Sequence, residues 1–61
     1  MIYINYRSEY TPREVETLEE YKDTERAEAY RVLAEYRESD EKGTYYTSQR
    51  CTKDWREKNN K

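Results

Sequence analysis

The stretch DTERAEAYRVLAEYRES, residues 23–39, has the clearest periodicity in the chain. Apolar residues at i, i+3, i+4 and i+7 predict a helix over residues 24–39 with one core-facing stripe. Asp23 or Thr24 can cap its start, and Gly43, the only glycine, follows its end and can adopt a positive φ there. The stripe comprises Ala29, Val32, Leu33 and Tyr36, and Ala27, Tyr30 and Ala34 widen it on one flank.

The N-terminal residues alternate with a period of two, which is typical of a half-buried β-strand. Over residues 2–6, one face carries Ile2, Ile4 and Tyr6, and the other carries Tyr3 and Asn5. A helix with a single apolar stripe must bury that stripe against another element. We therefore expect the helix to pack on the face that bears Ile2, Ile4 and Tyr6.

Residues 14–21 fit two different structures. Alternation along this segment favours a second strand. Residues 11–14 instead have the form of a capping box with proline at the first helical position, and Val15 and Leu18 follow at helical spacing. If residues 14–21 form a strand, the chain is expected to have an α+β fold: a small antiparallel sheet of about three strands with one helix on one face, in ββαβ order. If they are helical, the expected fold is a helical hairpin in which residues 12–22 form one helix. The sequence pattern alone leaves both folds open.

Strand chemistry returns after the glycine, over residues 44–52. Alternation there places Tyr45 and Tyr46 on opposite faces of the sheet. Trp55 follows, and we expect it to pack back and fix the end of this strand. The polar residues 56–61 are expected to form a frayed C-terminal tail.

Length and composition indicate a small tyrosine-rich core. The 61 residues are 43% charged and 33% hydrophobic, with eight tyrosines, one tryptophan and no phenylalanine. We expect one domain over residues 1–55, with tyrosine rings in the core and their hydroxyls at its edge. Because so small a core gives marginal stability, self-association as a homodimer is a further expectation.

The residues of the common catalytic and metal sites are missing from the sequence. It has no histidine, one glycine and one cysteine, Cys51, which do not fit a catalytic triad, a zinc site or a glycine-rich phosphate loop. We therefore expect a protein that is not an enzyme and that uses no cofactor or metal. No apolar run reaches the ~20 residues that span a bilayer. Together with the unpaired thiol, this predicts a cytoplasmic protein with no membrane partner.

The C-terminal third combines aromatic and basic side chains. Residues 43–61 hold five basic residues against two acidic ones, although the whole chain has a net charge of -2. Tyrosine, tryptophan and arginine are enriched at protein interfaces, and aromatic residues among cations also suit single-stranded nucleic acids. The low overall basicity favours a protein partner over nucleic acid, and packing of these rings in the core is the third interpretation. The candidate partner-binding residues are Tyr45, Tyr46, Arg50, Lys53 and Trp55.

Three short motifs follow one another in the second half of the chain: EYRESD at residues 35–40, YYTSQR at 45–50 and KDW at 53–55. Preceded by a short strand and an acidic segment, this order resembles a class of very short phage and mobile-element proteins with a ββαβ arrangement. The resemblance implies that residues 14–21 form a strand. It also implies that the chain binds and inhibits a host protein, and it carries no catalytic residues.

Overall fold

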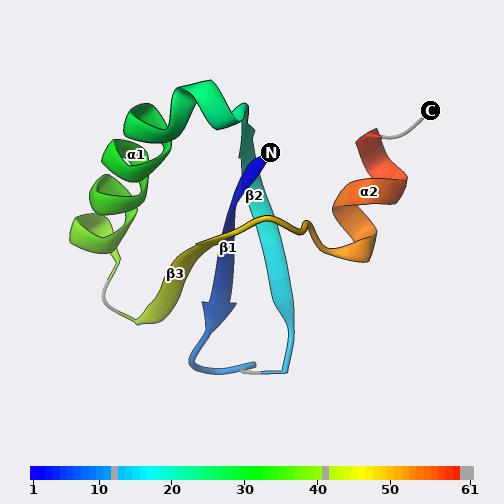
Figure 1. Cartoon of the computed structure of the whole chain (residues 1–61). Helices are drawn as coiled ribbons and strands as arrows, with labels where there is room; N and C mark the ends of the chain where they lie inside the picture. The colour runs from blue at the N-terminus through cyan, green and yellow to red at the C-terminus, as the bar shows by residue number, and fades with distance from the viewer. Residues whose placement is uncertain (12, 41, 60–61) are drawn as a thin grey trace.

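A computed structural model of the chain describes residues 1–11, 13–40 and 42–59. Three strands, a short 3-10 helix and two α-helices follow one another in the order β1, β2, η1, α1, β3 and α2 (Figure 1). Their bounds are Ile2–Ser8, Val15–Tyr21, Asp23–Glu25, Arg26–Ser39, Gly43–Ser48 and Lys53–Asn59. The predicted α+β fold in ββαβ order is confirmed, with α2 added at its end, and the helical-hairpin alternative is wrong.

The strands form one antiparallel sheet in the order β2-β1-β3, with β1 in the centre. The pairing of β1 with β2 shifts register between Ile4, which lies opposite Glu19, and Asn5, which lies opposite Thr17. Leu18 therefore has no partner on β1 and forms a β-bulge. The pairing of β1 with β3 runs without a shift from Tyr3 opposite Ser48 to Ser8 opposite Gly43.

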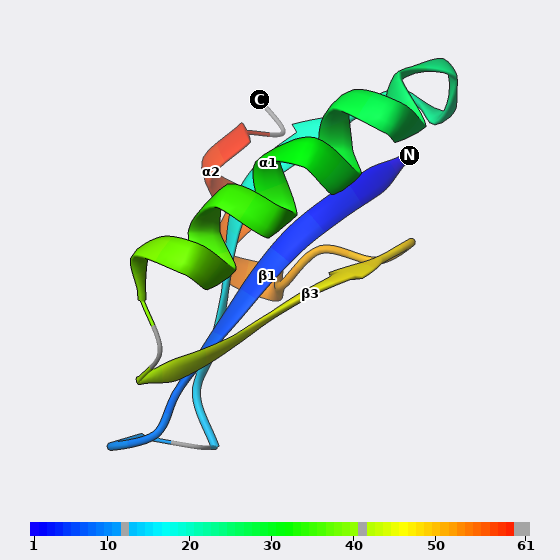
Figure 2. The same cartoon turned by 90° about the vertical axis from the view of Figure 1, so that its left-hand side faces the viewer.

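Helix α1 covers one face of the sheet (Figure 2). The buried cluster beneath it consists of Ile4, Leu33 and Tyr45, one residue each from β1, α1 and β3. Since Ile4 and Tyr6 both pack in this cluster, the predicted covered face is confirmed. The partly buried residues around the cluster are Tyr6, Leu18, Tyr21, Val32 and Tyr36.

Tyrosine rings fill much of the space between α1 and the sheet. The Tyr45 ring stacks on Tyr36, with 5.1 Å between the ring centroids, and its centroid lies 4.7 Å from that of Tyr6. Gly43 begins β3 beside these rings, and no residue with a positive φ occurs in the described part of the chain. The prediction of a positive φ at Gly43 is therefore wrong. Glycine is required there because a Cβ atom would lie only 2.7 Å from Cζ of Tyr6.

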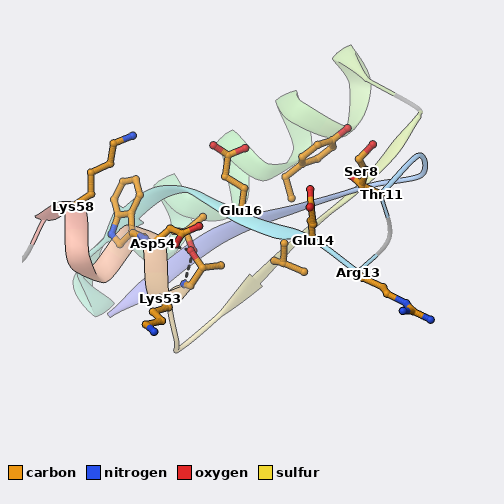
Figure 3. Close-up of a pocket in the computed structure, with 13 residues that line it drawn as sticks. Ser8, Thr11, Arg13, Glu14, Glu16, Lys53, Asp54 and Lys58 are labelled. Atoms are coloured by element: carbon orange, nitrogen blue, oxygen red, sulfur yellow. Dashed lines mark hydrogen bonds between the residues drawn. The ribbon is translucent and has the colours of Figure 1, made fainter.

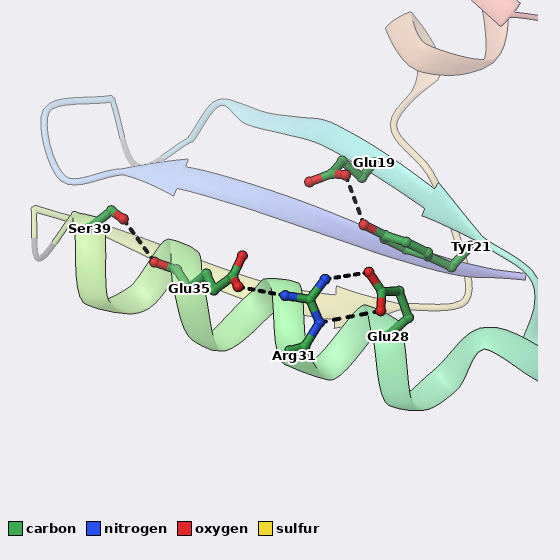
Figure 4. Close-up of polar contacts among 6 residues, drawn as sticks. All are labelled: Glu19, Tyr21, Glu28, Arg31, Glu35 and Ser39. Carbon is green, nitrogen blue, oxygen red and sulfur yellow. Dashed lines mark hydrogen bonds and ion pairs between the residues drawn. The ribbon is translucent and has the colours of Figure 1, made fainter.

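The hydroxyls of Tyr21, Tyr36 and Tyr45 lie at the edge of the core, as the sequence predicts, and each donates to a carboxylate. The Tyr21 and Tyr36 hydroxyls donate to the two oxygens of Glu19, at 2.8 and 2.6 Å (Figure 4 shows the Tyr21 bond). The Tyr45 hydroxyl donates to Oδ2 of Asp40 at 2.9 Å. Burial and the nearby carboxylate raise the pKa of Tyr21 and Tyr45 to about 12. The hydrogen bond to Glu19, followed by burial, raises the pKa of Tyr36 to about 12 as well.

The C-terminal part differs from the prediction in two ways. Strand β3 ends at Ser48 rather than at residue 52, because the Ser48 hydroxyl donates to the Arg50 carbonyl at 2.6 Å and the chain turns. Residues 53–59 then form α2, so the expected frayed tail is helical as far as residue 59. Residues 60 and 61 of that tail lie outside the described residues. Trp55 is part of this helix.

Candidate functional site

The face of the sheet opposite α1 carries a line of polar side chains, one from each strand. Asn5 Nδ2 donates to Ser48 Oγ at 2.7 Å, and Thr17 Oγ1 donates to Asn5 Oδ1 at 2.7 Å. Asn5 and Thr17 are only 3% and 4% exposed, so these bonds replace water for buried polar groups. The backbone N–H of Thr52 then donates to Thr17 Oγ1 at 2.9 Å. This polar line ties the segment after β3 to β2, across the sheet.

Thr52 also starts α2. Its hydroxyl accepts the Trp55 N–H at 3.4 Å and its carbonyl accepts the Arg56 N–H at 3.1 Å, which is how a threonine caps a helix. An acidic residue in the first turn, Asp54, and basic residues in the last turn suit the helix dipole. The polar line and the cap together fix where α2 leaves the sheet, and so they position Trp55.

Trp55 is half-buried and lines two hollows. The larger has a volume of about 720 Å³ and lies between β2, the turn before it and α2 (Figure 3). In Figure 3, Lys53, Asp54 and Lys58 lie at the α2 end of this hollow and Arg13 lies at the other. The smaller hollow, of about 360 Å³, includes Tyr3. Besides Arg13, the basic residues that line one or other hollow are Arg50, Lys53, Arg56 and Lys58.

Carboxylates stand among these cations. The larger hollow includes Glu14, Glu16 and Asp54, and the smaller one includes Glu20. Partial burial, followed by the nearby Glu20, raises the pKa of Tyr3 above its ordinary value. The result is a surface of mixed charge around an aromatic centre, without a continuous positive stripe.

The structure separates the five candidate residues that the sequence predicted. Tyr45 is buried under α1, so it belongs to the core and not to an exposed surface. Tyr46 is half-buried on the opposite face, where it pairs with Asn5. Trp55 lines both hollows, Lys53 lines the larger one and Arg50 lines the smaller one, so these three residues lie near one another.

Sequence reasoning missed the polar line and the basic residues of α2 as parts of this site. For the polar line, the available signal was Asn5, at a strand position that alternation places away from the helix. Alternation puts Thr17 on the same face as Tyr21, and only the bulge at Leu18 turns it toward Asn5. For α2, the signal was Thr52, which can cap a helix, followed two residues later by the acidic residue Asp54 in the first turn.

Thr17→Val is expected to loosen α2 and to lower the free energy of unfolding. Valine keeps the shape, but it leaves the Asn5 amide oxygen and the Thr52 N–H without their partner, which costs roughly 1–3 kcal/mol. Urea unfolding followed by Trp55 fluorescence measures the loss, and the emission of the folded variant should shift to the red. Thr44→Val, at an exposed position of β3, is the matched control and should stay within about 0.5 kcal/mol. Equal stability of the two variants would contradict a supporting role for the polar line.

Searches for a metal site, for a membrane-spanning helix and for similar proteins found none in the described chain. Among residues 1–11, 13–40 and 42–59, no group of three or more acidic or cysteine side chains could hold a metal ion. Over the same described ranges, no helix is both long enough and apolar enough to cross a membrane. Comparison of the chain with protein-family models, with curated proteins and with solved structures gave no match.

Proposed function

We propose that this protein is a non-enzymatic binding module that recognises a partner protein through the Trp55 surface. We define the Trp55 surface by Tyr3, Arg50, Lys53, Trp55 and Arg56. The observation that carries the proposal is the position of Trp55 between two hollows, ringed by basic side chains. Tryptophan and arginine supply the largest share of binding energy in protein interfaces, where a central aromatic residue is surrounded by polar groups that exclude water.

The chemistry of the surface favours a protein partner that presents acidic side chains around an apolar one. The cations around Trp55 suit acidic side chains on the partner, and the larger hollow can receive an apolar side chain between them. Glu16, Glu20 and Asp54 interrupt the cations, and such carboxylates repel the closely spaced phosphates of a nucleic acid. The resemblance to short phage and mobile-element proteins supports inhibition of a host protein as the biological role, and a cytoplasmic location would suit that role.

The test is affinity capture from bacterial lysate with variants that separate Trp55 from other exposed aromatic residues. A specific partner should be captured saturably and displaced by untagged protein. Trp55→Ala should weaken its binding on the order of 30-fold, as expected for a central tryptophan. Lys53→Glu reverses an exposed charge without touching the core, so it should also weaken binding if Trp55→Ala proves too unstable to use. Tyr10→Ala is the control, because Tyr10 is 72% exposed and lies outside this surface.

Two results would contradict this function. The first is a partner whose binding is the same for Trp55→Ala, Lys53→Glu and Tyr10→Ala. The second is salt-dependent binding of single-stranded oligonucleotides that Lys53→Ala or Tyr46→Ala weakens, which would support a nucleic-acid-binding or regulatory role instead.

A further inference from the structure

The outer edge of β3 presents backbone groups that the sheet does not use. In the described chain β3 has one strand neighbour, β1. The carbonyl of Tyr45 accepts from Arg37 of α1, at 3.2 Å from Nε and 3.0 Å from Nη2, so it points away from β1. Because inward and outward groups alternate along an antiparallel strand, the N–H and C=O groups of Gly43, Tyr45 and Thr47 face outward.

The two edges of the sheet differ in charge and in cover. Edge strand β2, VETLEEY, carries three glutamates, whereas edge strand β3, GTYYTS, carries no charged residue. Charged side chains on an edge strand discourage the addition of another strand. Thr17 of β2 also accepts the Thr52 N–H, and β2 contacts α2. Strand β3 carries no such charges, α1 reaches its outward groups through the Arg37 side chain, and the strand consists of β-branched, aromatic and small polar residues that favour pairing.

The flank of α1 beside β3 adds side chains to this edge. Tyr30 and Ala34 lie seven and three residues before Arg37, on the same side of the helix, and Tyr30 is 51% exposed. The opposite flank carries Glu28 and Glu35, which both pair with Arg31 (Figure 4). The side of α1 that overlooks β3 is therefore aromatic and basic, whereas the other side is acidic.

Positive charge also brackets the strand. Lys42 precedes Gly43, Arg50 follows Ser48, and both are exposed. Arg37 uses Nε and Nη2 on Tyr45 and keeps other guanidinium N–H groups for a carboxylate. The Tyr45 carbonyl has two lone pairs, so Arg37 leaves it able to accept a second bond from an added strand.

We propose that the β3 edge accepts an extended, acidic segment of a partner protein as a fourth strand of the sheet. The backbone of the segment pairs with Gly43, Tyr45 and Thr47, as in other cases of β-strand addition. Its side chains on the helix side contact Tyr30, and its carboxylates bind Arg37. A second copy of this chain is a poorer occupant, because two β3 edges would bring like charges together. This edge shares only the flanking Arg50 with the Trp55 surface, and its backbone pairing and its Arg37 contact do not use that surface, so the proposal stands independently of the function proposed above.

The test is NMR of the full ¹⁵N-labelled chain with two blocked heptapeptides, one alternating glutamate with valine and the other alternating lysine with valine. The acidic peptide should slow hydrogen exchange at the amides of Tyr45 and Thr47, and leave that of Tyr46, already paired with β1, unchanged. It should bind at least about tenfold more tightly than the basic peptide, the scale of one charge-assisted contact. Arg37→Glu should weaken its binding by about tenfold.

Further variants make the result specific. Arg13→Glu gives the same charge change in the turn before β2 and should leave peptide binding unchanged, and so should Lys53→Glu on the Trp55 surface. Lys42→Glu lies outside the strand and tests the charge argument if Arg37→Glu does not fold. The proposal is overturned if the acidic peptide leaves exchange at Tyr45 and Thr47 unaffected, or if both peptides bind alike. It is also overturned if light scattering finds the free chain dimeric with these amides already protected.

Discussion

Leu33→Ala is expected to cause the largest loss of stability of any single substitution considered for this protein. Leu33 is 4% exposed and belongs to the buried cluster with Ile4 and Tyr45. Removing a buried leucine side chain typically costs roughly 2–5 kcal/mol, because the cavity collapses only in part. A domain of this length is typically stable by roughly 3–9 kcal/mol, so this one substitution removes most of the margin. Far-ultraviolet circular dichroism and urea unfolding measure the loss.

Leu18→Ala is the matched control, since it makes the same chemical change at the bulge of β2. Leu18 is half-buried and packs at the margin of the cluster, so its loss should cost clearly less than that of Leu33. A loss below about 1 kcal/mol for Leu33→Ala, or equal losses for both variants, would contradict a core centred on Ile4, Leu33 and Tyr45.

The β2 segment shows why the sequence left strand and helix open at residues 14–21. Its apolar residues Val15, Leu18 and Tyr21 are three positions apart, a spacing typical of a helix. The bulge at Leu18 changes which side chains face α1, so a strand can present Leu18 and Tyr21 to the core. Sequence alternation assumes an unbroken ladder, and it cannot anticipate where an extra residue is inserted.

Other elements divide between those that periodicity can predict and those that depend on tertiary contacts. Strand β1 and helix α1 follow their patterns, because each buries one face in the core. Tyr45 and Tyr46 are chemically identical, and only the pairing of Tyr45 with Tyr6 decides which ring enters the core. The end of β3 and the start of α2 depend on two hydroxyl groups. The Ser48 hydroxyl donates to the Arg50 carbonyl, and the Thr52 hydroxyl accepts the Trp55 N–H. Three predicted members of the site, Arg50, Lys53 and Trp55, are brought together by the turn after β3 and by helix α2, neither of which the sequence pattern predicts.

Above pH 10 the stability of the protein is expected to fall steeply. The pKa of Tyr21, Tyr36 and Tyr45 in the folded state is about 12, whereas the pKa of an unfolded tyrosine is about 10. The stability that these phenols contribute is complete below pH 10, because both states are then protonated. Between pH ~10 and ~12 the unfolded chain ionises first, so unfolding releases up to three protons and its free energy falls as pH rises. Urea midpoints across this range, with tyrosinate absorbance of the folded protein, measure the effect.

Glu19→Gln is the variant that identifies the cause. The Glu19 carboxylate accepts the hydroxyls of Tyr21 and Tyr36, and its negative charge opposes formation of both phenolates. Neutral glutamine should lower the pKa of these two phenols toward 10, so stability should fall less steeply between pH ~10 and ~12. Tyr45, whose hydroxyl is held by Asp40, should keep its raised pKa. Glu16→Gln, at an exposed position of the same strand, should retain the steep decline. If Glu19→Gln and Glu16→Gln follow the same curve, or if stability is constant up to pH ~12, the shared carboxylate does not control these tyrosines.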